Sequence, residues 1–238
     1  FELLDIEGAV GISAERLARR LNVTRGAFYH HFTSRDDYVR SLLAEWERTY
    51  TEIRRYSPAG RVPVLVDGDM TVWDSLAICE TLAERFPRAQ LWPADPKARA
   101  HARSVCAEMH SSFGNLRSNM PMNVTAVLPG MGWNVAVQRD IDRIAQMWTE
   151  LRQKYASEGP FLFGHFTVAD AFYAPVVSRF ATYGVRLPEA AKAYADHILN
   201  LPAMQEWIDG ARAENDFIAD DEPYRTALDE ETLVAANQ

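Results

Sequence analysis

The chain has 238 residues, of which 47% are hydrophobic and 24% charged, and a formal net charge of −8. These values are ordinary for a globular protein with a hydrophobic core, and no apolar run reaches the roughly 18 residues of a membrane span. The two cysteines lack CxxC spacing and the histidines lack ligand spacing, so we expect no disulfide scaffold, metal site or membrane segment. Without a signal-peptide pattern, the expected location is cytoplasmic. Because the chain begins at Phe1 and not at Met, we expect a fragment or a processed chain.

The negative charge is unevenly distributed. Residues 1–56 are neutral overall, whereas residues 57–238 carry the whole acidic excess. Within residues 12–40, six arginines outnumber three acidic side chains and form a small basic island. Any contact with a polyanion is therefore expected in that island, although a basic stripe is usually a solvated surface.

Two short helices followed by a long one are predicted at the start of the chain. Ser13 can cap the first helix, and Thr24 can cap a second, short helix over Arg25–Phe32. Acidic residues in a first turn then predict a long amphipathic helix from about Asp36 to Tyr56. This order is typical of a helix-turn-helix unit, in which the second helix enters the major groove of DNA.

The stretch "RLARRLNVTRGAFYHHFTSRDDYVRSLL" resembles the DNA-binding domain of TetR-family transcriptional regulators. The resemblance implies a helix-turn-helix head over residues 1–56 that contacts double-stranded DNA through residues 13–35. The residues it places at the DNA are Thr24, Arg25 and Ala27 at the start of the recognition helix, then Tyr29 and His30, and Arg35 as the phosphate-binding cation. The alternative is a three-helix packing unit that does not bind DNA.

After Tyr56 the pattern changes from helical to β. In "GRVPVLVDGDMTVWDS", an Asp-Gly pair between two apolar runs predicts a β-hairpin over residues 62–73. Pro63 in the first run favours an edge strand or a cis peptide bond. Asp74 and Ser75 then predict the start of a helix that ends near Phe86.

This stretch, followed by "LWPADPKARAHARSVCAEMHSSFGNLRSNMPMN" and "FLFGHFTVADAFYAPVVSRFATYGV", resembles cytosolic glutathione transferases over roughly residues 57–215. The resemblance implies a truncated thioredoxin-like part over residues 57–90, made of the hairpin and one helix. An all-helical domain follows over 91–220, and an acidic polar tail over 221–238. The expected fold class is therefore mainly α, with a helix-turn-helix unit first.

The same resemblance implies glutathione as a ligand or substrate. It makes the Val62–Pro63 peptide cis and places it at the cysteinyl part of glutathione, and it places Asp74 and Ser75 at the γ-glutamyl end. From the sequence itself, Thr167 and Asp170 fit a capping box at the start of a helix over residues 168–180. In this family that box is structural.

We expect no catalytic residue. In the transferases a Tyr, Ser or Cys after the first β-strand stabilises the glutathione thiolate, and no such strand precedes Ser57. Cys79 and Cys106 have helical core spacing and are expected to pack in preference to acting as nucleophiles. Four further residues either line a substrate pocket or pack between helices, with packing favoured: His110, Phe113, Met120 and Met122.

Three functions remain open from the sequence. The first is a DNA-binding regulator whose transferase-like body dimerises or senses a ligand. The second is a glutathione transferase-type enzyme or isomerase, and the third is a fusion or fragment without an evolved function. A lone hairpin has an open edge that a second chain can cover, so we expect a homodimer.

Overall fold

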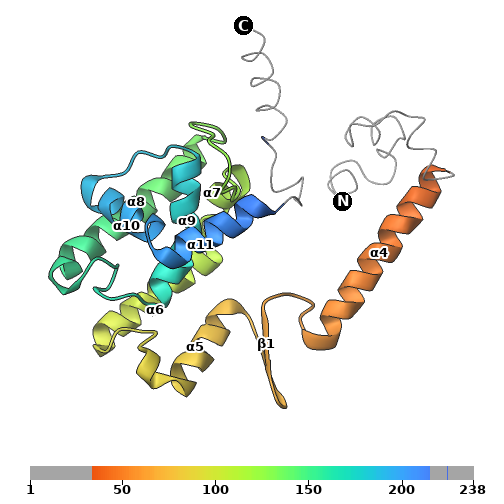
Figure 1. Ribbon diagram of the computed structural model, residues 1–238, viewed down its shortest axis with the longest axis horizontal. Helices are drawn as coiled ribbons and strands as arrows, with labels where there is room; N and C mark the ends of the chain where they lie inside the picture. Colours follow the sequence, from red (N-terminus) through yellow and green to blue (C-terminus); the bar gives the residue numbers. More distant parts are fainter. Residues whose placement is uncertain (1–33, 215–223, 225–238) are drawn as a thin grey trace, which may run out of the picture. The chain divides into compact units, whose positions relative to one another are not determined.

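The structure is a computed structural model of the protein, and it describes residues 34–214 and residue 224. The chain divides into two compact units, residues 1–78 and 79–238, and each is described by itself (Figure 1). The two short helices predicted before residue 34 lie outside the described residues. So do five of the predicted DNA-contacting residues: Thr24, Arg25, Ala27, Tyr29 and His30.

Helix α4 (Arg35–Tyr56) is the long helix that the sequence predicts in the first unit. It begins at Arg35 because the Ser34 side chain accepts a hydrogen bond from the Asp37 amide at 3.1 Å. Arg35, predicted to bind phosphate, is thus the first residue of this helix.

A tight turn follows α4. The Ser57 amide donates to the Ile53 carbonyl at 2.8 Å, and the buried Ser57 hydroxyl accepts from the Arg61 amide at 3.0 Å. Gly60 has a φ of +65°, and a Cβ there would lie 3.0 Å from the Tyr50 ring. The chain therefore leaves α4 through a defined turn.

The hairpin contains strands β1 (Val64–Asp67) and β2 (Met70–Trp73), paired antiparallel in a two-stranded sheet. Val64 pairs with Trp73, and Asp67 pairs with Met70 across a two-residue turn. Gly68 in that turn has a φ of +63°, which glycine adopts at little cost. The predicted hairpin is confirmed, although β1 starts two residues later than the apolar run because Pro63 cannot donate a ladder hydrogen bond.

Helix α5 (Ser75–Arg85) follows the hairpin, and the helical region continues from there. Its elements are η1 (Pro87–Ala89), α6 (Pro96–Ser111), α7 (Gly114–Asn119), α8 (Val135–Tyr155), η2 (Ala156–Glu158), α9 (Val168–Thr182), α10 (Glu189–Leu199) and α11 (Pro202–Ala213). The mainly helical fold class is thus confirmed for the residues that the structure describes.

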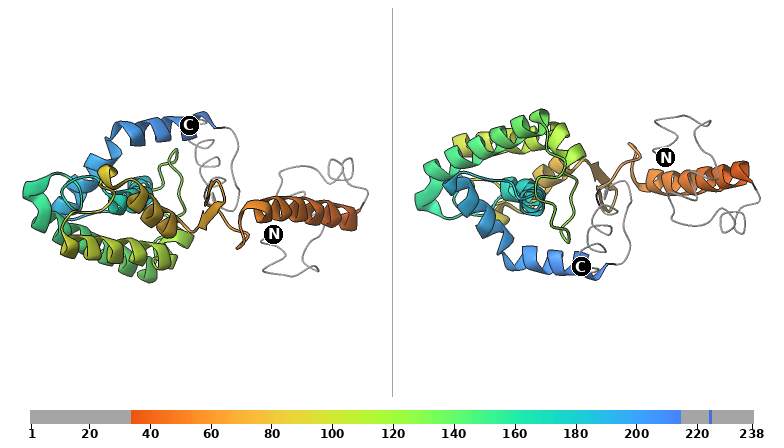
Figure 2. Two further views of the ribbon diagram at one scale, coloured as in Figure 1. Left: turned by 90° about the horizontal axis from the view of Figure 1, so that it is seen from below. Right: turned by 90° about the horizontal axis from the view of Figure 1, so that it is seen from above.

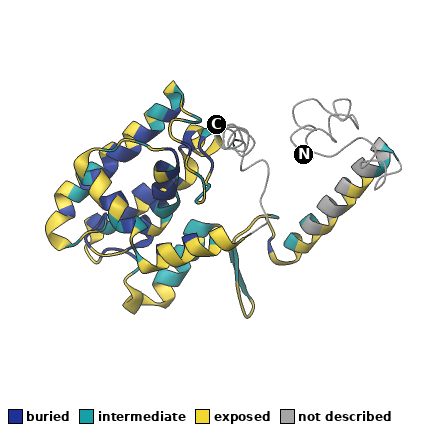
Figure 3. Cartoon of the chain, turned by 45° about the horizontal axis from the view of Figure 1, so that its top comes forward, coloured by how far each residue is buried: buried dark blue, intermediate teal, exposed yellow. Residues whose placement is uncertain are grey.

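The core of the helical region lies around Trp148 on α8. Its fully buried ring contacts Tyr173 of α9 and Tyr194 of α10 edge to face, at centroid distances of 5.8 Å and 5.0 Å. The Tyr173 hydroxyl donates to the carbonyl of Val105 on α6 at 3.2 Å. Figure 2 shows α9 running through the middle of this region, and Figure 3 shows that its buried residues are concentrated in these helices.

None of the helices that the structure describes is long and apolar enough to cross a membrane.

The segment between α7 and α8 is held in place by side chains at the C-terminal end of α9. Thr182 and Tyr183 donate to the carbonyls of Asn123 and Pro121, at 2.6 Å and 2.9 Å. These bonds satisfy carbonyl groups of a long connection that has no ladder partners of its own.

Candidate functional site

The four residues predicted to bind glutathione lie together at the open end of the hairpin. Val64 pairs with Trp73, so the next residue outward on each strand is Pro63 on one side and Asp74 on the other. The Val62–Pro63 peptide is cis, and Val62 is 73% exposed. The antiparallel register thus brings together two sequence positions that are eleven residues apart, at the end opposite the Gly68 turn.

Asp74, the residue immediately before α5, has an unusual backbone conformation. Its φ is +76°, in the left-handed region that L-residues other than Asn and Asp rarely adopt. Its Oδ1 accepts from the Leu76 amide at 2.9 Å and, more weakly, from the Ala77 amide at 3.4 Å. The side chain therefore caps the helix while the backbone turns sharply out of β2, a strain that the sequence did not predict.

Ser75 is the first residue of α5 and is half-buried. Within residues 34–214, neither its amide nor its hydroxyl has a recorded hydrogen-bond partner, whereas the next two amides point to Asp74. The amide and the hydroxyl of this one residue are thus donors at a helix N-terminus, where the helix dipole favours a negative charge.

The capping box at α9 is a separate, buried structure. The Asp170 carboxylate accepts from the amides of Leu162 and Thr167 at 3.0 Å and 2.8 Å, and the Thr167 hydroxyl accepts from the Ala169 amide at 3.3 Å. Burial raises the pKa of Asp170, and these hydrogen bonds partly offset that rise. Both Thr167 and Asp170 are almost fully inaccessible to solvent, so they hold α9 and do not face a ligand.

The two cysteines are not activated. Burial raises the pKa of the half-buried Cys79 thiol, and the neighbouring Glu80 raises it further. Burial also raises the pKa of Cys106, which is fully buried on α6. Since the thiolate is the nucleophilic form, both environments favour packing over chemistry.

The sequence left two roles open for four residues, lining a substrate pocket or packing between helices. In the structure these four residues differ in burial. Phe113 and Met120 are buried in the helical core, whereas Met122 and His110 are exposed. Packing thus accounts for the first two. Among the residues that the structure describes, no cluster of His, Cys, Asp and Glu side chains could hold a metal ion.

The sequence also missed contacts that fix the start of the helical region. Arg103 of α6 binds Glu80 of α5 through two hydrogen bonds of 2.6 Å and 2.8 Å, and its guanidinium lies 5.9 Å from the ring of Trp92. The side chains of Glu80 and Arg103 are twenty-three positions apart, with no short-range spacing that could have revealed the pair.

Together, these features define a glutathione transferase-like body. They are a cis-proline before the first strand, a hairpin, a helix that starts at Asp-Ser, and a helical domain with a buried capping box. Sequence comparison agrees. Residues 32–85 match the profile "Glutathione S-transferase, N-terminal domain", and residues 134–213 match "Glutathione S-transferase, C-terminal domain". Residues 1–42 match the profile "Bacterial regulatory proteins, tetR family".

Individual proteins are similar over much of the chain. A stringent starvation protein A homolog of Haemophilus ducreyi is 23% identical over 65% of this chain and 71% of its own length. Glutathione S-transferase Z1 of Arabidopsis thaliana is 27% identical over 71% of this chain and 78% of its own length. For a second stringent starvation protein A homolog, from Coxiella burnetii, the matched region is only 60% of that protein.

A solved structure shares both the fold and part of the sequence. It is a glutathione transferase homologue from Burkholderia with bound glutathione, 26% identical, with a TM-score of 0.51. The match covers 68% of this chain and 80% of that one. The body of this chain is therefore glutathione transferase-like in both sequence and fold.

The profiles of the two families overlap within residues 32–42, at the start of α4. The sequence analysis places the border later, between Tyr56 and Ser57. The tight turn at Ser57 is compatible with a border there, and that position stays a prediction.

Proposed function

We propose that the chain binds glutathione through residues 62–75 of its transferase-like body. In this proposal the body serves a TetR-like DNA-binding head as its ligand-sensing or dimerisation domain. The observation that supports the first part is the strand register, which puts Pro63 opposite Asp74, with Val62 and Ser75 next to them in the chain. The similarity to a transferase homologue with bound glutathione supports the choice of ligand.

The chemistry of the site suits the γ-glutamyl end of glutathione, which carries one carboxylate and one ammonium group. The Ser75 amide and hydroxyl can donate to the carboxylate, with help from the α5 dipole. The exposed Asp74 carboxylate attracts the ammonium group. The exposed Val62 backbone offers peptide groups to the cysteinyl part.

Titration of reduced glutathione into the full chain by isothermal calorimetry tests this site. We expect Ser75→Ala and Asp74→Ala each to weaken binding by roughly tenfold, because each removes a hydrogen bond to a charged group. Asp95→Ala is the matched control, since Asp95 caps α6 by accepting from the Ala98 amide at 2.8 Å and is not one of the residues of the proposed site. No binding at millimolar glutathione, or equal losses in all three variants, would disprove the site.

The DNA-binding head rests on the match of residues 1–42 to the TetR family and on the basic island over residues 12–40. Contacts to phosphate release counterions, so binding to duplex DNA should weaken steeply with salt. The expected result is retention of random duplex DNA at low salt and its release at high salt. Arg25→Ala and Tyr29→Ala should weaken retention, and no retention at low salt would exclude this role.

A transferase or isomerase is the second candidate, favoured by the 27% identity to glutathione S-transferase Z1 of Arabidopsis thaliana. The described thiols argue against it because burial raises the pKa of both. A conjugation assay with glutathione and 1-chloro-2,4-dinitrobenzene separates the two functions. We expect glutathione binding without turnover, and robust turnover would establish the enzyme instead.

A further inference from the structure

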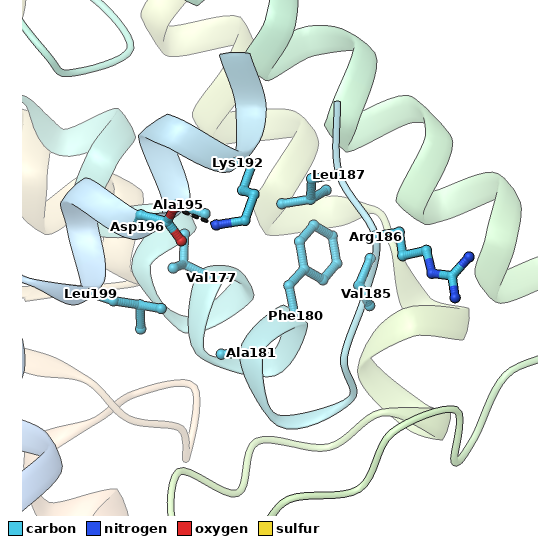
Figure 4. Close-up of a pocket in the computed structure, with 10 residues that line it drawn as sticks. All are labelled: Val177, Phe180, Ala181, Val185, Arg186, Leu187, Lys192, Ala195, Asp196 and Leu199. Carbon is cyan, nitrogen blue, oxygen red and sulfur yellow. Dashed lines mark hydrogen bonds and ion pairs between the residues drawn. The ribbon is translucent and has the colours of Figure 1, made fainter. Parts of the chain in front are cut away.

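A cavity of about 460 Å³ lies within the helical region, between the end of α9, the connection over residues 183–188, and α10 (Figure 4). Its walls are mostly apolar, and the buried Val177 and Phe180 form its inner side. Val185, Leu187 and Leu199 complete the walls and are half-buried. The volume is in the range of small-molecule sites, which is about 300–1,000 Å³.

The cavity follows from the choice of side chains. Ala181 of α9 and Ala195 of α10 both line it, and neither has a side chain long enough to fill the space between the helices. The ring of Phe180 packs on Trp148 at a centroid distance of 5.4 Å, and this contact holds Phe180 at the wall of the cavity. The apolar walls are therefore held in place by the core behind them.

Charged side chains stand at the open side of the cavity. The Lys192 ammonium donates to the Asp196 carboxylate at 2.5 Å, and an ammonium group has three donors, of which this bond uses one. Arg186 also lines the cavity, is exposed, and has no recorded partner within residues 34–214. Figure 4 shows its guanidinium directed away from the apolar side chains of the cavity.

Of the three charged side chains that line the cavity, two are cations and one is a carboxylate, and this balance favours a ligand with a negative head. We propose that the cavity binds a small amphipathic monocarboxylate. Its apolar part lies against Val177, Phe180 and Leu187, and its carboxylate accepts a hydrogen bond from Lys192. The exposed Arg186 adds a long-range attraction. The site is independent of glutathione binding by residues 62–75, so either proposal can fail alone.

Calorimetric titration of decanoate into the full chain tests this proposal, with decanol and decylamine as neutral and cationic probes of equal length. We expect decanoate to bind most tightly. Lys192→Met keeps the apolar stem and removes the charge, and should weaken decanoate by roughly tenfold. Asp196→Asn removes the competing carboxylate and should not weaken it. Decylamine binding as tightly as decanoate, or no effect of Lys192→Met, would overturn the proposal.

The position of the site is tested by filling it. Ala181→Phe places an aromatic ring at the exposed side of the cavity and should abolish decanoate binding. Ala193→Phe is the matched control, since Ala193 is exposed on α10 and does not line the cavity. Thermal unfolding checks that both variants fold, and glutathione titration should give unchanged affinity in both. Decanoate binding that survives Ala181→Phe would place the site elsewhere and overturn the proposal.

Discussion

Helices α5 and α9 each have an aspartate at or near the N-terminus that accepts hydrogen bonds from backbone amides, and the two aspartates differ in their exposure to water. At α9 the Asp170 carboxylate is fully buried and accepts from two amides at 3.0 Å and 2.8 Å. At α5 the Asp74 carboxylate is exposed, and its backbone has a φ of +76°. The buried cap has become part of the core, whereas the exposed one stays accessible to a ligand.

The same contrast extends beyond the caps. Helix α5 has no buried residue, whereas α9 is buried along most of its length. Burial of apolar surface supplies most of the stability of a fold, so the free energy of unfolding should depend chiefly on α6, α8, α9 and α10. The proposed glutathione-binding residues therefore lie in a part of the chain that contributes little to the free energy of unfolding.

The largest expected effect is that of Asp170→Ala. It leaves the buried amides of Leu162 and Thr167 without acceptors, and we expect a loss of about 3 kcal/mol in the free energy of unfolding. Asp74→Ala, at the exposed cap, should cost only about 1 kcal/mol. Urea denaturation followed by circular dichroism measures both, and equal losses would contradict the contrast between the two caps.

A smaller effect is expected from pH. Burial raises the pKa of Asp170 above its usual value of 3.8, so the folded state holds this proton more tightly than the unfolded state. The resulting stability is fully present below the unfolded pKa and is lost as the pH rises through the folded pKa. Relative to Asp170→Asn, the wild type should therefore lose stability as the pH increases through the mildly acidic range.

Urea denaturation of both proteins at a series of pH values measures this difference. Because the wild type and the Asp170→Asn variant share all other carboxyl groups, the contribution of those groups drops out of the difference between the two proteins. If the wild type instead gains stability relative to Asp170→Asn as the pH increases, the hydrogen bonds to Asp170 outweigh the effect of burial on its pKa, and the prediction is wrong.

The smallest effect concerns the Arg103–Glu80 pair that joins α5 to α6. Exposed ion pairs contribute little, so Glu80→Gln should cost less than about 1 kcal/mol of unfolding free energy. Arg143–Glu108, which joins α6 to α8, is a matched pair with the same distance of 2.6 Å. A much larger loss for Glu80→Gln than for Glu108→Gln in urea denaturation would show that α5 depends on its ion pair more than the core helices do.

Local sequence signals located several elements closely. The acidic residues of the first turn predicted the start of α4, the Asp-Gly pair predicted the hairpin, and Thr167 with Asp170 predicted the start of α9. Each signal acts over fewer than five residues, because capping and tight turns are interactions between near neighbours. The end of α9 was placed two residues early, at Phe180 and not Thr182, since no residue there ends a helix as clearly as a cap begins one.

Distant contacts were not visible in the same way. The packing of Trp148 against Tyr173 and Tyr194, and the bond between Arg103 and Glu80, join residues from different helices. Nothing in the spacing of these residues encodes which helices become neighbours. The cavity between α9 and α10 is of this kind too, because it depends on two alanines facing the same space.

The sequence by itself determined three of the described helices (α4, α5 and α9), the hairpin and the transferase-like character of the body, since each depends on short patterns and on motifs in a fixed order. It also supplied the residues of the proposed glutathione site. Only the tertiary structure decided which carboxylates are buried, that the strand register places Pro63 beside Asp74, and that a cavity opens beside Lys192. Burial and register depend on packing between segments far apart in the chain, and that packing forms only when the whole body folds.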